Sequence, residues 1–454
     1  MTVANTSISG DPNVELFKKV YGQMHDLVPE DQLLAKDIGW SDGDKVGSKF
    51  VEDVVLGHEV GITMGGSGQE AFEIDPAIAG AVKQTEVSPY VTILPSVLPF
   101  ATISRSAGGG EKAFFEATKF ITRNNLKSHN DFQEVLRIYG QSSGLLGYAS
   151  YFSGTFRSAS FTNGTGTLNG ITFTNGVNAA SKAILFSPGE FAAGHWVGKQ
   201  GVKVAQVNSS GVVTAAGKLV SVNAQYCYII VDFAPTAPTA APDGTNTPVS
   251  GTSRICYTRM STASDMIGMD YILRSSTTLF NISQTQFPLF KGNVVNLAQT
   301  KLTLGKLQTA LADAVNGGGL EGDVTVYVNP RSWATLGTTE AGLRVYDKSY
   351  SPQQAQNGFM DLEFYTQTGK LTIKAHRKVK EGYAYALLLN TWKRSGSAQV
   401  GFRVPGMSQG EGDLIRPLEN QAGYQFKSYA DEYMFCWAPA QNLVFTGISD
   451  EAAA

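Results

Sequence analysis

The sequence predicts an α+β protein organised around one long helix, with a small β-barrel domain inserted after that helix. Residues 111–140 carry the clearest helical periodicity of the chain, an apolar stripe made by Phe132, Val135, Leu136 and Tyr139. Residues 146–262 fall into short alternating segments rich in Gly, Ser, Thr and Val, a pattern typical of a small sandwich or barrel. The rest of the chain mixes helical and extended segments.

The long helix is expected to be continuous, because no Pro or Gly interrupts residues 111–139. At about 1.5 Å per residue its length is about 45 Å. A break in the polar segment 124–130 is the alternative, with Ser128 and Asp131 capping the second half. Gly140 is predicted to end the helix as the C′ residue.

Composition restricts the class of protein. The chain has 454 residues, 42% hydrophobic and 17% charged, with 49 glycines, so it can bury a large core and should contain many strands and turns. The net charge of −3 gives the whole molecule no electrostatic attraction to nucleic acid. No apolar run approaches the ~18 residues of a membrane helix, and no signal peptide opens the chain.

The first 110 residues predict two elements without a core of their own. Residues 1–48 are polar and predict an arm with one short helix at 11–25. Residues 49–110 predict an extended β-hairpin with a glycine-rich tip at 64–70 and a return strand interrupted by three prolines. Such a hairpin cannot bury both faces, so we expect a partner to cover it. An ordinary solvated hairpin is the alternative.

The chain from residue 263 onward predicts a mixed α/β unit. An amphipathic helix at 302–315, with Thr303 as its N-cap, ends at the glycines 317–319. A strand at 323–328 follows, and Pro330 can open the next helix. Further strands are expected at 371–376, 383–389, 424–435 and 442–448.

No motif predicts a catalytic residue, a cofactor or a metal site. Residues 140–144 match the G-x-S-x-G pattern around Ser142, but that motif needs a preceding strand and here follows a helix, so we interpret it as a helix-ending turn. The five histidines show no metal-binding spacing. Cys227, Cys256 and Cys436 are interpreted as free buried thiols, with a Cys227–Cys256 disulfide as the alternative.

Charge is distributed unevenly along the chain. Residues 1–110 hold fifteen acidic and seven basic residues, whereas the stretch 370–394 is basic. We predict that the acidic arm and hairpin of one subunit pair with the basic stretch of a neighbouring subunit. A solvated basic face and a nucleic-acid contact are the alternatives. The residues predicted for the inter-subunit contact are Glu52, Asp53, Glu59, Glu70, Glu73, Lys370, Lys374, Arg377, Lys378 and Lys380.

The order of these parts resembles the major capsid protein of tailed bacteriophages, the Hong Kong 97-type shell fold. Residues 49–110 resemble its extended loop, and 111–145 the spine helix of its peripheral domain. Residues 263–400 resemble the axial domain together with part of the peripheral domain. The resemblance to the axial domain lies in the segments LTLGKLQTALADAVNGGG and DVTVYVNPRSWATL. AGYQFKSYADEYMFCWAPAQNLVFTGI, within 401–454, resembles the last peripheral strands. The arm at 1–48 and an inserted β-domain at 146–262 complete the assignment.

The resemblance implies a structural subunit, not an enzyme, that assembles with itself into hexamers and pentamers and encloses double-stranded DNA. It implies a place in the virion after assembly in the host bacterial cytoplasm. The implied partners are portal and scaffolding proteins and a decoration protein, with no membrane. The alternatives are an encapsulin-like nanocompartment shell, a phage decoration or tail protein, and a hydrolase that uses Ser142.

Overall fold

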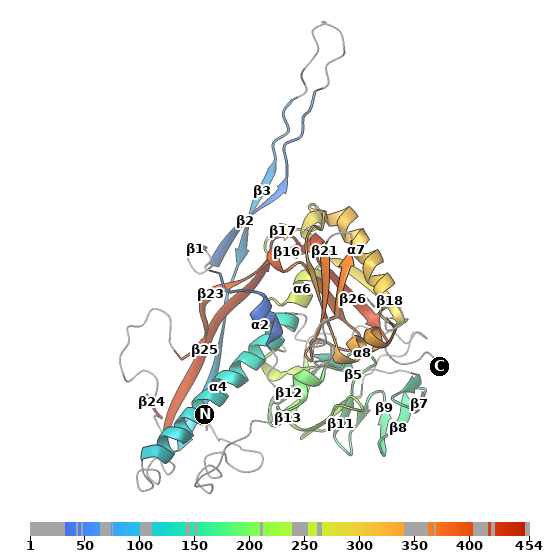
Figure 1. Cartoon of the computed structure of the whole chain (residues 1–454). Helices are drawn as coiled ribbons and strands as arrows, with labels where there is room; N and C mark the ends of the chain where they lie inside the picture. The colour runs from blue at the N-terminus through green and yellow to red at the C-terminus, as the bar shows by residue number, and fades with distance from the viewer. Residues whose placement is uncertain are drawn as a thin grey trace, which may run out of the picture.

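The computed structural model describes residues 32–41, 44–46, 49–63, 74, 76–99, 111–141, 146–149, 153–208, 212–237, 253–260, 266–339, 362–366, 369–402, 416–418 and 423–449. They form a broad body from which a narrow hairpin projects (Figure 1). The body combines a six-stranded α/β sheet, a second sheet against which the long helix packs, and an eleven-stranded sheet. The expected helix at 11–25, the hairpin tip at 64–70 and Ser142 lie outside the described residues.

The six-stranded sheet is mixed and runs in the order β18-β26-β22-β19-β21-β20. Helix α7 (Leu304–Gly318) packs Leu307 and Leu311 into the apolar core of this sheet. Thr303 caps α7 by accepting a hydrogen bond from the Lys306 N–H, and left-handed Gly319 ends it, as predicted. Helix α8 opens at Pro330 and runs Pro330–Thr339. The strands are β18 (Asn293–Thr300), β19 (Val324–Val328), β20 (Leu362–Thr366), β21 (Gly369–Ala375), β22 (Ala384–Leu387) and β26 (Leu443–Ile448).

Strand β26 corrects one prediction. The sequence assigns all of 401–454 to the strands that lie with the long helix, but β26 pairs with β18 and β22 in the six-stranded sheet. The chain leaves the long-helix sheet at a single 3₁₀ turn, Pro439–Gln441. The C-terminal segment therefore joins the two sheets.

The long helix α4 (Glu111–Tyr139) is continuous, which confirms the prediction of an unbroken helix. It lies along β25 (Gly423–Cys436), as Figure 1 shows. Side chains 133–139 are all buried, although the sequence predicted only one apolar stripe. The C-terminal turns of α4 are thus enclosed on every side. In this sheet β25 pairs with β23 (Trp392–Gly401), β24 (Arg416–Pro417) and β4 (Tyr90–Pro99).

Gly140 follows α4 but is not its left-handed C′ residue. Gln141 takes the left-handed conformation instead, at φ 51°. A Cβ on Gly140 would lie 2.0 Å from the carbonyl oxygen of Met266. The carbonyl of Gly140 also accepts a hydrogen bond from the Gly268 N–H at 2.9 Å. Glycine is required at this position because two backbones meet there.

The projecting hairpin consists of β2 (Lys49–Gly57) and β3 (Ala81–Val87), with β1 (Asp44–Val46) added at its base. Val55 lies opposite Val82, and an isolated bridge between Val60 and Ile78 continues the pairing outward. The hairpin is shorter than the predicted 49–110, because β3 ends at Val87.

Strand β4 belongs to the body instead of the hairpin. It pairs with β25 over ten positions, from Tyr90 opposite Glu432 to Pro99 opposite Gly423. No other described strand pairs with β4, so it is an edge strand and can accommodate Pro95 and Pro99. Its alternating pattern is the same in a hairpin as in a sheet, which is why sequence alone does not separate the two.

The inserted unit is a ladder of eleven strands in the order β5-β15-β12-β13-β14-β11-β10-β9-β8-β7-β6. Its two ends, β5 and β6, are not joined by any described pairing, so a closed barrel stays a prediction. The strands are β5 (Gly147–Ala149), β6 (Gly154–Phe156), β7 (Ala159–Thr162), β8 (Thr165–Leu168), β9 (Ile171–Thr174), β10 (Val177–Asn178), β11 (Ala183–Leu185), β12 (Lys203–Val207), β13 (Val213–Asn223), β14 (Tyr228–Val231) and β15 (Ser253–Tyr257).

Two-residue turns give the outer strands of this ladder a six-residue period. Three of these turns are Asn-Gly pairs, beginning at Asn163, Asn169 and Asn175. Both residues of each pair have positive φ, near 50° for Asn and 76° for Gly. Positive φ at both positions is the requirement of the type I′ turn, whose twist matches that of a β-hairpin. The sequence therefore encodes this part of the sheet locally.

Candidate assembly interface

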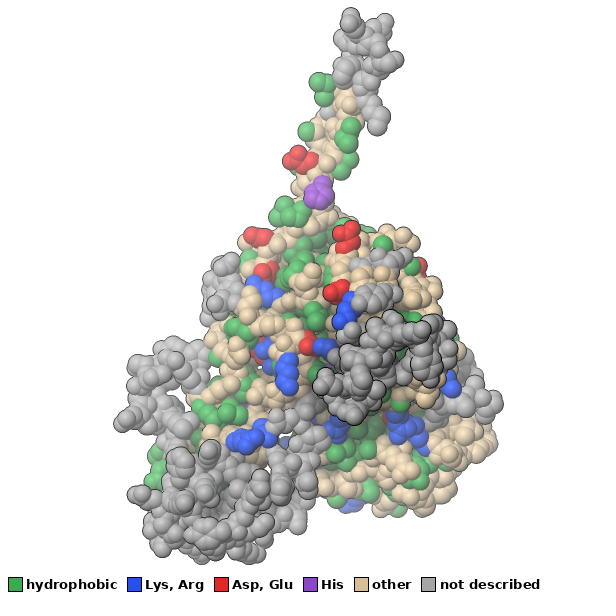
Figure 2. All heavy atoms as spheres, in the orientation of Figure 1, with side chains coloured by type: hydrophobic (Ala, Val, Ile, Leu, Met, Phe, Trp, Pro, Cys, Tyr) green, Lys and Arg blue, Asp and Glu red, His purple; other side chains and the backbone are tan. Residues whose placement is uncertain are grey.

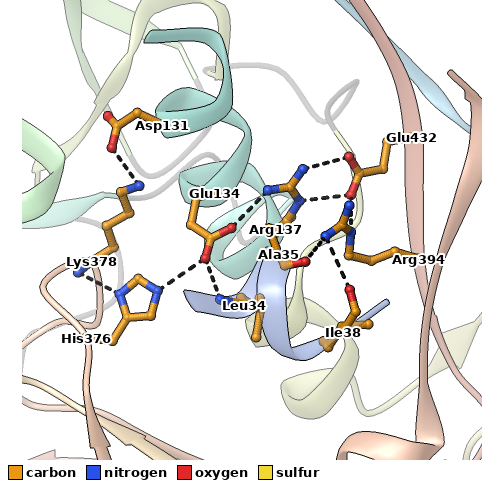
Figure 3. A network of polar contacts seen from close by, with 10 residues as sticks. All are labelled: Leu34, Ala35, Ile38, Asp131, Glu134, Arg137, His376, Lys378, Arg394 and Glu432. Carbon is orange, nitrogen blue, oxygen red and sulfur yellow. Dashed lines mark hydrogen bonds and ion pairs between the residues drawn. The ribbon is translucent and has the colours of Figure 1, made fainter. Parts of the chain in front are cut away.

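The described part of the arm contains a short helix, and side chains of the body form hydrogen bonds with backbone groups at both of its ends. This helix, α2 (Leu33–Asp37), has no capping side chain of its own. The Leu34 N–H donates to Glu134 Oε1 of α4 at 2.7 Å, and Arg394 Nη1 donates to the Ala35 carbonyl at 2.6 Å (Figure 3). A carboxylate thus faces the positive end of the helix and a guanidinium its negative end, the favourable arrangement for the helix dipole.

These capping residues belong to a buried ionic network between α4 and its sheet. Arg137 binds Glu432 through two hydrogen bonds of 2.8 Å and binds Glu134 at 2.9 Å. Arg394 Nε donates to the same Glu432 at 2.8 Å. The side chains of Arg137, Glu134 and Glu432 are at most 2% exposed. Two carboxylates therefore balance two guanidiniums in the interior, as buried charges require.

The pKa values of the carboxyls follow from this pairing. Burial by itself raises the pKa of Glu134, but the hydrogen bond from His376 and the charge of Arg137 outweigh it and hold that pKa at about 2. Burial likewise opposes ionisation of Glu432, and its hydrogen bonds to Arg137 lower the pKa below the ordinary value. Glu134 is therefore ionised at neutral pH, and its pairing with the guanidiniums favours the ionised form of Glu432 as well.

His376 links this network to the loop that follows β21. Its Nδ1 accepts from the Lys378 N–H at 3.1 Å, so Nε2 carries the hydrogen of the neutral ring and faces Glu134 Oε1 at 3.4 Å. Lys378 Nζ forms an ion pair with Asp131 of α4 at 2.6 Å. The loop is thereby fixed to two successive turns of α4 (Figure 3).

The same loop, residues 376–383 and called the junction loop below, also binds the inserted sheet. Lys380 Nζ pairs with Glu190 at 3.0 Å, and the Tyr383 hydroxyl donates to the other oxygen of Glu190 at 2.9 Å. The Lys380 ammonium also lies 4.9 Å from the ring centroid of Tyr139, the last residue of α4. One loop therefore joins the helix, the inserted sheet and the six-stranded sheet.

The predicted basic contact residues are largely engaged inside the subunit. Lys378 and Lys380 are buried, and their ion pairs lie within the chain, so the surface role predicted for them is wrong. Lys374 pairs with Asp37 of the arm at 2.9 Å. The backbone N–H of Lys370 donates to Asp323 at 2.8 Å. Arg377 is described, and its carbonyl accepts from the Gly194 N–H at 3.1 Å.

The predicted acidic contact residues divide into three groups. Glu52 pairs with Lys393 of β23 at 2.6 Å, inside the same subunit. Asp53 and Glu59 are exposed on the hairpin and are still available to a neighbouring molecule. Glu70 and Glu73 lie outside the described residues. The structure thus brings acidic and basic residues together within one chain, where the sequence predicted a contact between chains.

The outward part of the hairpin exposes aliphatic side chains. Ile62 is 83% exposed, and the cross-strand pair of Val55 and Val82 is also exposed. Figure 2 shows hydrophobic side chains along the described hairpin where it stands clear of the body. The exposed aliphatic residues of this surface, called the hairpin stripe below, are Val55, Val60, Ile62, Ile74, Ile78 and Val82.

The described residues contain no group of three or more His, Cys, Asp or Glu side chains placed to hold a metal ion. Within the same part of the chain, no helix has the length and apolar character that crossing a membrane requires. All three cysteines are free and buried, which confirms the thiol prediction.

His129 couples α4 to both neighbouring strands. Its Nδ1 lies 2.8 Å from Ser428 Oγ of β25, and its Nε2 lies 2.8 Å from Thr92 Oγ1 of β4. Burial and the charge of Arg137 lower the pKa of His129 to about 4, while the charge of Glu432 opposes that change. The imidazole is therefore neutral at neutral pH and makes two hydrogen bonds to hydroxyl groups.

Sequence reasoning missed the ionic network almost completely. One signal was present, because Glu134 and Arg137 are charged residues three apart beside Val135 and Leu136 of the apolar stripe. A charged pair at that spacing on an exposed helix face is ordinary. Only the burial of residues 133–139 reveals that the pair is internal.

No family model and no curated protein matches this sequence. Among solved structures, the chain is similar to a chain of the capsid asymmetric unit of cyanophage A-1(L). The identity is 9% and the TM-score 0.51, over 95% of this chain and 96% of that one. This chain has the fold of a phage capsid subunit. The match spans nearly the whole length of both chains.

Two weaker similarities extend over equally large parts of the chain. The capsid of a native GTA particle matches at 7% identity and a TM-score of 0.42, over 98% of both chains. The SrpI encapsulin complex from Synechococcus elongatus PCC 7942 matches at 8% identity and a TM-score of 0.39, over 95% of both. Both scores lie below 0.5, so neither decides between a virus head and a nanocompartment.

We predict that Glu432→Gln lowers the free energy of unfolding of this capsid-fold subunit by about 3–5 kcal/mol, because it leaves two buried guanidiniums facing one carboxylate. Glu86→Gln is the matched control, since Glu86 pairs with Lys49 on the exposed hairpin, where an ion pair contributes at most about 1 kcal/mol. Urea denaturation of the assembly-free subunit measures both. Equal losses in the two variants would show that the network contributes no special stability.

We also predict that stability falls as the pH drops from about 6.5 to about 4. Unfolded His129 binds its proton near pH 6.5, whereas the folded subunit binds it only near pH 4, so acid favours unfolding in this window. Buried His195, whose pKa is also lowered by burial, acts in the same direction. His129→Gln should therefore flatten the dependence of the urea midpoint on pH without abolishing it. An unchanged slope would contradict this assignment.

Proposed function

We propose that this chain is the shell-forming subunit of an icosahedral virus head with a Hong Kong 97-type fold. In this proposal it assembles with itself into hexamers and pentamers around packaged double-stranded DNA, and it acts structurally, not as an enzyme. The hairpin stripe carries the proposal, because a capsid-fold chain presents it with no cover from its own body. The structural similarity to the cyanophage chain supports the fold, and the stripe supports assembly.

The described part of the hairpin has no core of its own beyond its base. Its base packs Phe50 against Tyr433 at a ring distance of 4.9 Å, but the described residues 58–62 and 76–80 are exposed to solvent. Isolated two-stranded hairpins are marginal in water. Burying one Val or Ile side chain contributes about 1.5–3 kcal/mol, so a neighbouring copy that covers the stripe stabilises both the hairpin and the contact.

Shell assembly multiplies this contact. Each copy offers one hairpin and receives another, so a ring of copies closes without leaving an uncovered stripe. Weak contacts that form simultaneously add to a strong closed shell. Asp53 and Glu59, exposed beside the stripe, are the acidic residues we retain as inter-subunit contacts. Glu52, Lys374, Lys378 and Lys380 instead form ion pairs within one chain.

We assign the parts of the chain on the same basis. Residues 1–48 are the arm, 49–87 the extended loop, 111–145 the spine helix and 146–262 the inserted domain. The six-stranded sheet is the axial domain, and β4 with β23 to β25 forms the peripheral sheet.

We further propose that portal and scaffolding proteins act as partners, with a decoration protein as a further one, and that the chain resides in the virion after assembly in a bacterial host. The net charge of −3 is consistent with enclosing DNA without binding its sequence.

The hairpin stripe can be tested by removing two of its side chains. We predict that Ile62→Ser with Ile78→Ser strongly reduces the yield of closed particles while leaving the monomer folded, because both side chains are exposed in the single subunit. Sedimentation velocity and negative-stain electron microscopy measure the particles, and circular dichroism measures the fold.

The matched control is Val212→Ser with Val220→Ser, which removes two exposed aliphatic side chains of the inserted unit. This control should assemble like the wild type. Normal particle yield from the hairpin variant would contradict the proposed role of the stripe, and an equal loss in both variants would show only that exposed aliphatic residues matter in general.

A further inference from the structure

An arginine links the outer hairpin of the inserted sheet to the body. Arg157 lies in the two-residue turn between β6 and β7. Its Nη2 forms an ion pair with Glu381 of the junction loop and donates a hydrogen bond to Cys227 Sγ at 3.3 Å. The guanidinium therefore bridges the inserted sheet and the body, and it covers the Cys227 thiol.

The opposite side of this contact is built from the body. Arg331 of α8 binds Glu381 Oε1 at 3.2 Å and donates to the Gln225 carbonyl at 3.4 Å. Glu381 thus accepts from two arginines on different elements. A pocket beside them is lined by Arg157, Arg331 and Glu381, so the ion pairs lie next to solvent.

The two turns that reach Glu381 adopt unusual backbone conformations. Arg157 has φ 49° and Cys227 has φ 56°, both in the left-handed region that residues other than glycine occupy at a cost. Each turn belongs to the inserted sheet, and each meets the same carboxylate. The positive φ values of Arg157 and of Ser158, 66°, are those of a two-residue hairpin turn, so the turn itself sets the backbone there and the contact with Glu381 adds to it.

The hairpin that carries Arg157 is weakly joined to its own sheet. Strand β7 pairs with β8 at only two positions, Phe161 with Gly166 and Thr162 with Thr165. No described strand pairs with the outer side of β6. Two buried side chains, Phe156 and Phe161, are the main apolar contribution of this hairpin. Each contributes about 1.5–3 kcal/mol, so local opening costs less than unfolding the subunit.

We propose that the hairpin of residues 154–162 is a latch. Closed, it fixes the outer edge of the inserted sheet to the body through Arg157 and Glu381 and seals Cys227. Open, it releases that edge as a unit while the ladder from β8 to β15 and the body stay folded. The latch is thereby a releasable attachment of the sheet's outer edge, while contacts such as the Glu190–Lys380 and Lys199–Asp131 pairs keep the rest of the inserted unit on the body.

The three cysteines supply the test. Cys227 is beneath the latch, whereas Cys256 is buried in β15 and Cys436 in β25. In the native wild-type protein, iodoacetamide should label Cys227 faster than the other two, with mass spectrometry measuring the rate at each site. Arg157→Leu should raise the rate at Cys227 by tenfold or more and leave the other rates unchanged.

The chemistry makes this increase diagnostic. Burial raises the pKa of the Cys227 thiol, and the charge of Arg157 opposes that rise. Removing Arg157 therefore raises the pKa further, which slows alkylation if the latch stays closed. Arg157→Lys keeps the ion pair and should label close to the wild-type rate. Lys49→Leu, which removes an exposed ion pair on the projecting hairpin, should change nothing at Cys227.

The latch is overturned if Arg157→Leu leaves Cys227 labelling unchanged or slower, or if all three cysteines accelerate together, since the latter reports global unfolding. If Arg157→Leu does not fold, the wild-type rates alone decide: equal labelling of the three cysteines contradicts the latch.

Discussion

The paired charges of Arg137 and Glu432 are the interaction on which the rest of this structure depends. They join α4 to β25 across 295 residues of sequence, in an interior where neither charge is stable alone. Glu134 and Arg394 complete the charge balance and then use their remaining hydrogen-bonding groups on the arm. The arm helix α2 has no side-chain cap of its own. Its docking therefore depends on the same carboxylate and guanidinium groups that balance charge between α4 and its sheet.

The junction loop extends this principle to the inserted sheet. Its side chains divide between two partners: His376 and Lys378 bind α4, whereas Lys380 and Glu381 bind the inserted unit. The stretch 376–383 reads as a basic surface in the sequence, but in the folded chain it connects internal elements. In the proposed assembly this gives a division of roles, in which buried charge fixes the shape of one chain and exposed aliphatic residues of the hairpin contact the next copy.

Much of the fold could be predicted because its determinants are local. Thr303 and the glycines at 317–319 mark the ends of α7, and the absence of breakers makes α4 continuous. The ionic network could not be predicted, because it depends on which distant residues meet. The roles of Lys378 and Lys380 were wrong for the same reason: charge counted along the chain says nothing of Asp131 and Glu190. Strand β4 was misassigned because alternating apolar and polar residues indicate a half-buried strand but do not identify the strand with which it pairs.

The central claim is that a second copy of the chain completes the hairpin stripe. Hydrogen exchange measured by mass spectrometry on the wild-type chain, before and after assembly, tests it most directly. The account predicts that assembly slows exchange in peptides covering 49–63 and 76–87, with little change in the enclosed turns of α4 at 133–139. Closed particles whose hairpin peptides exchange as fast as in the free subunit would contradict it.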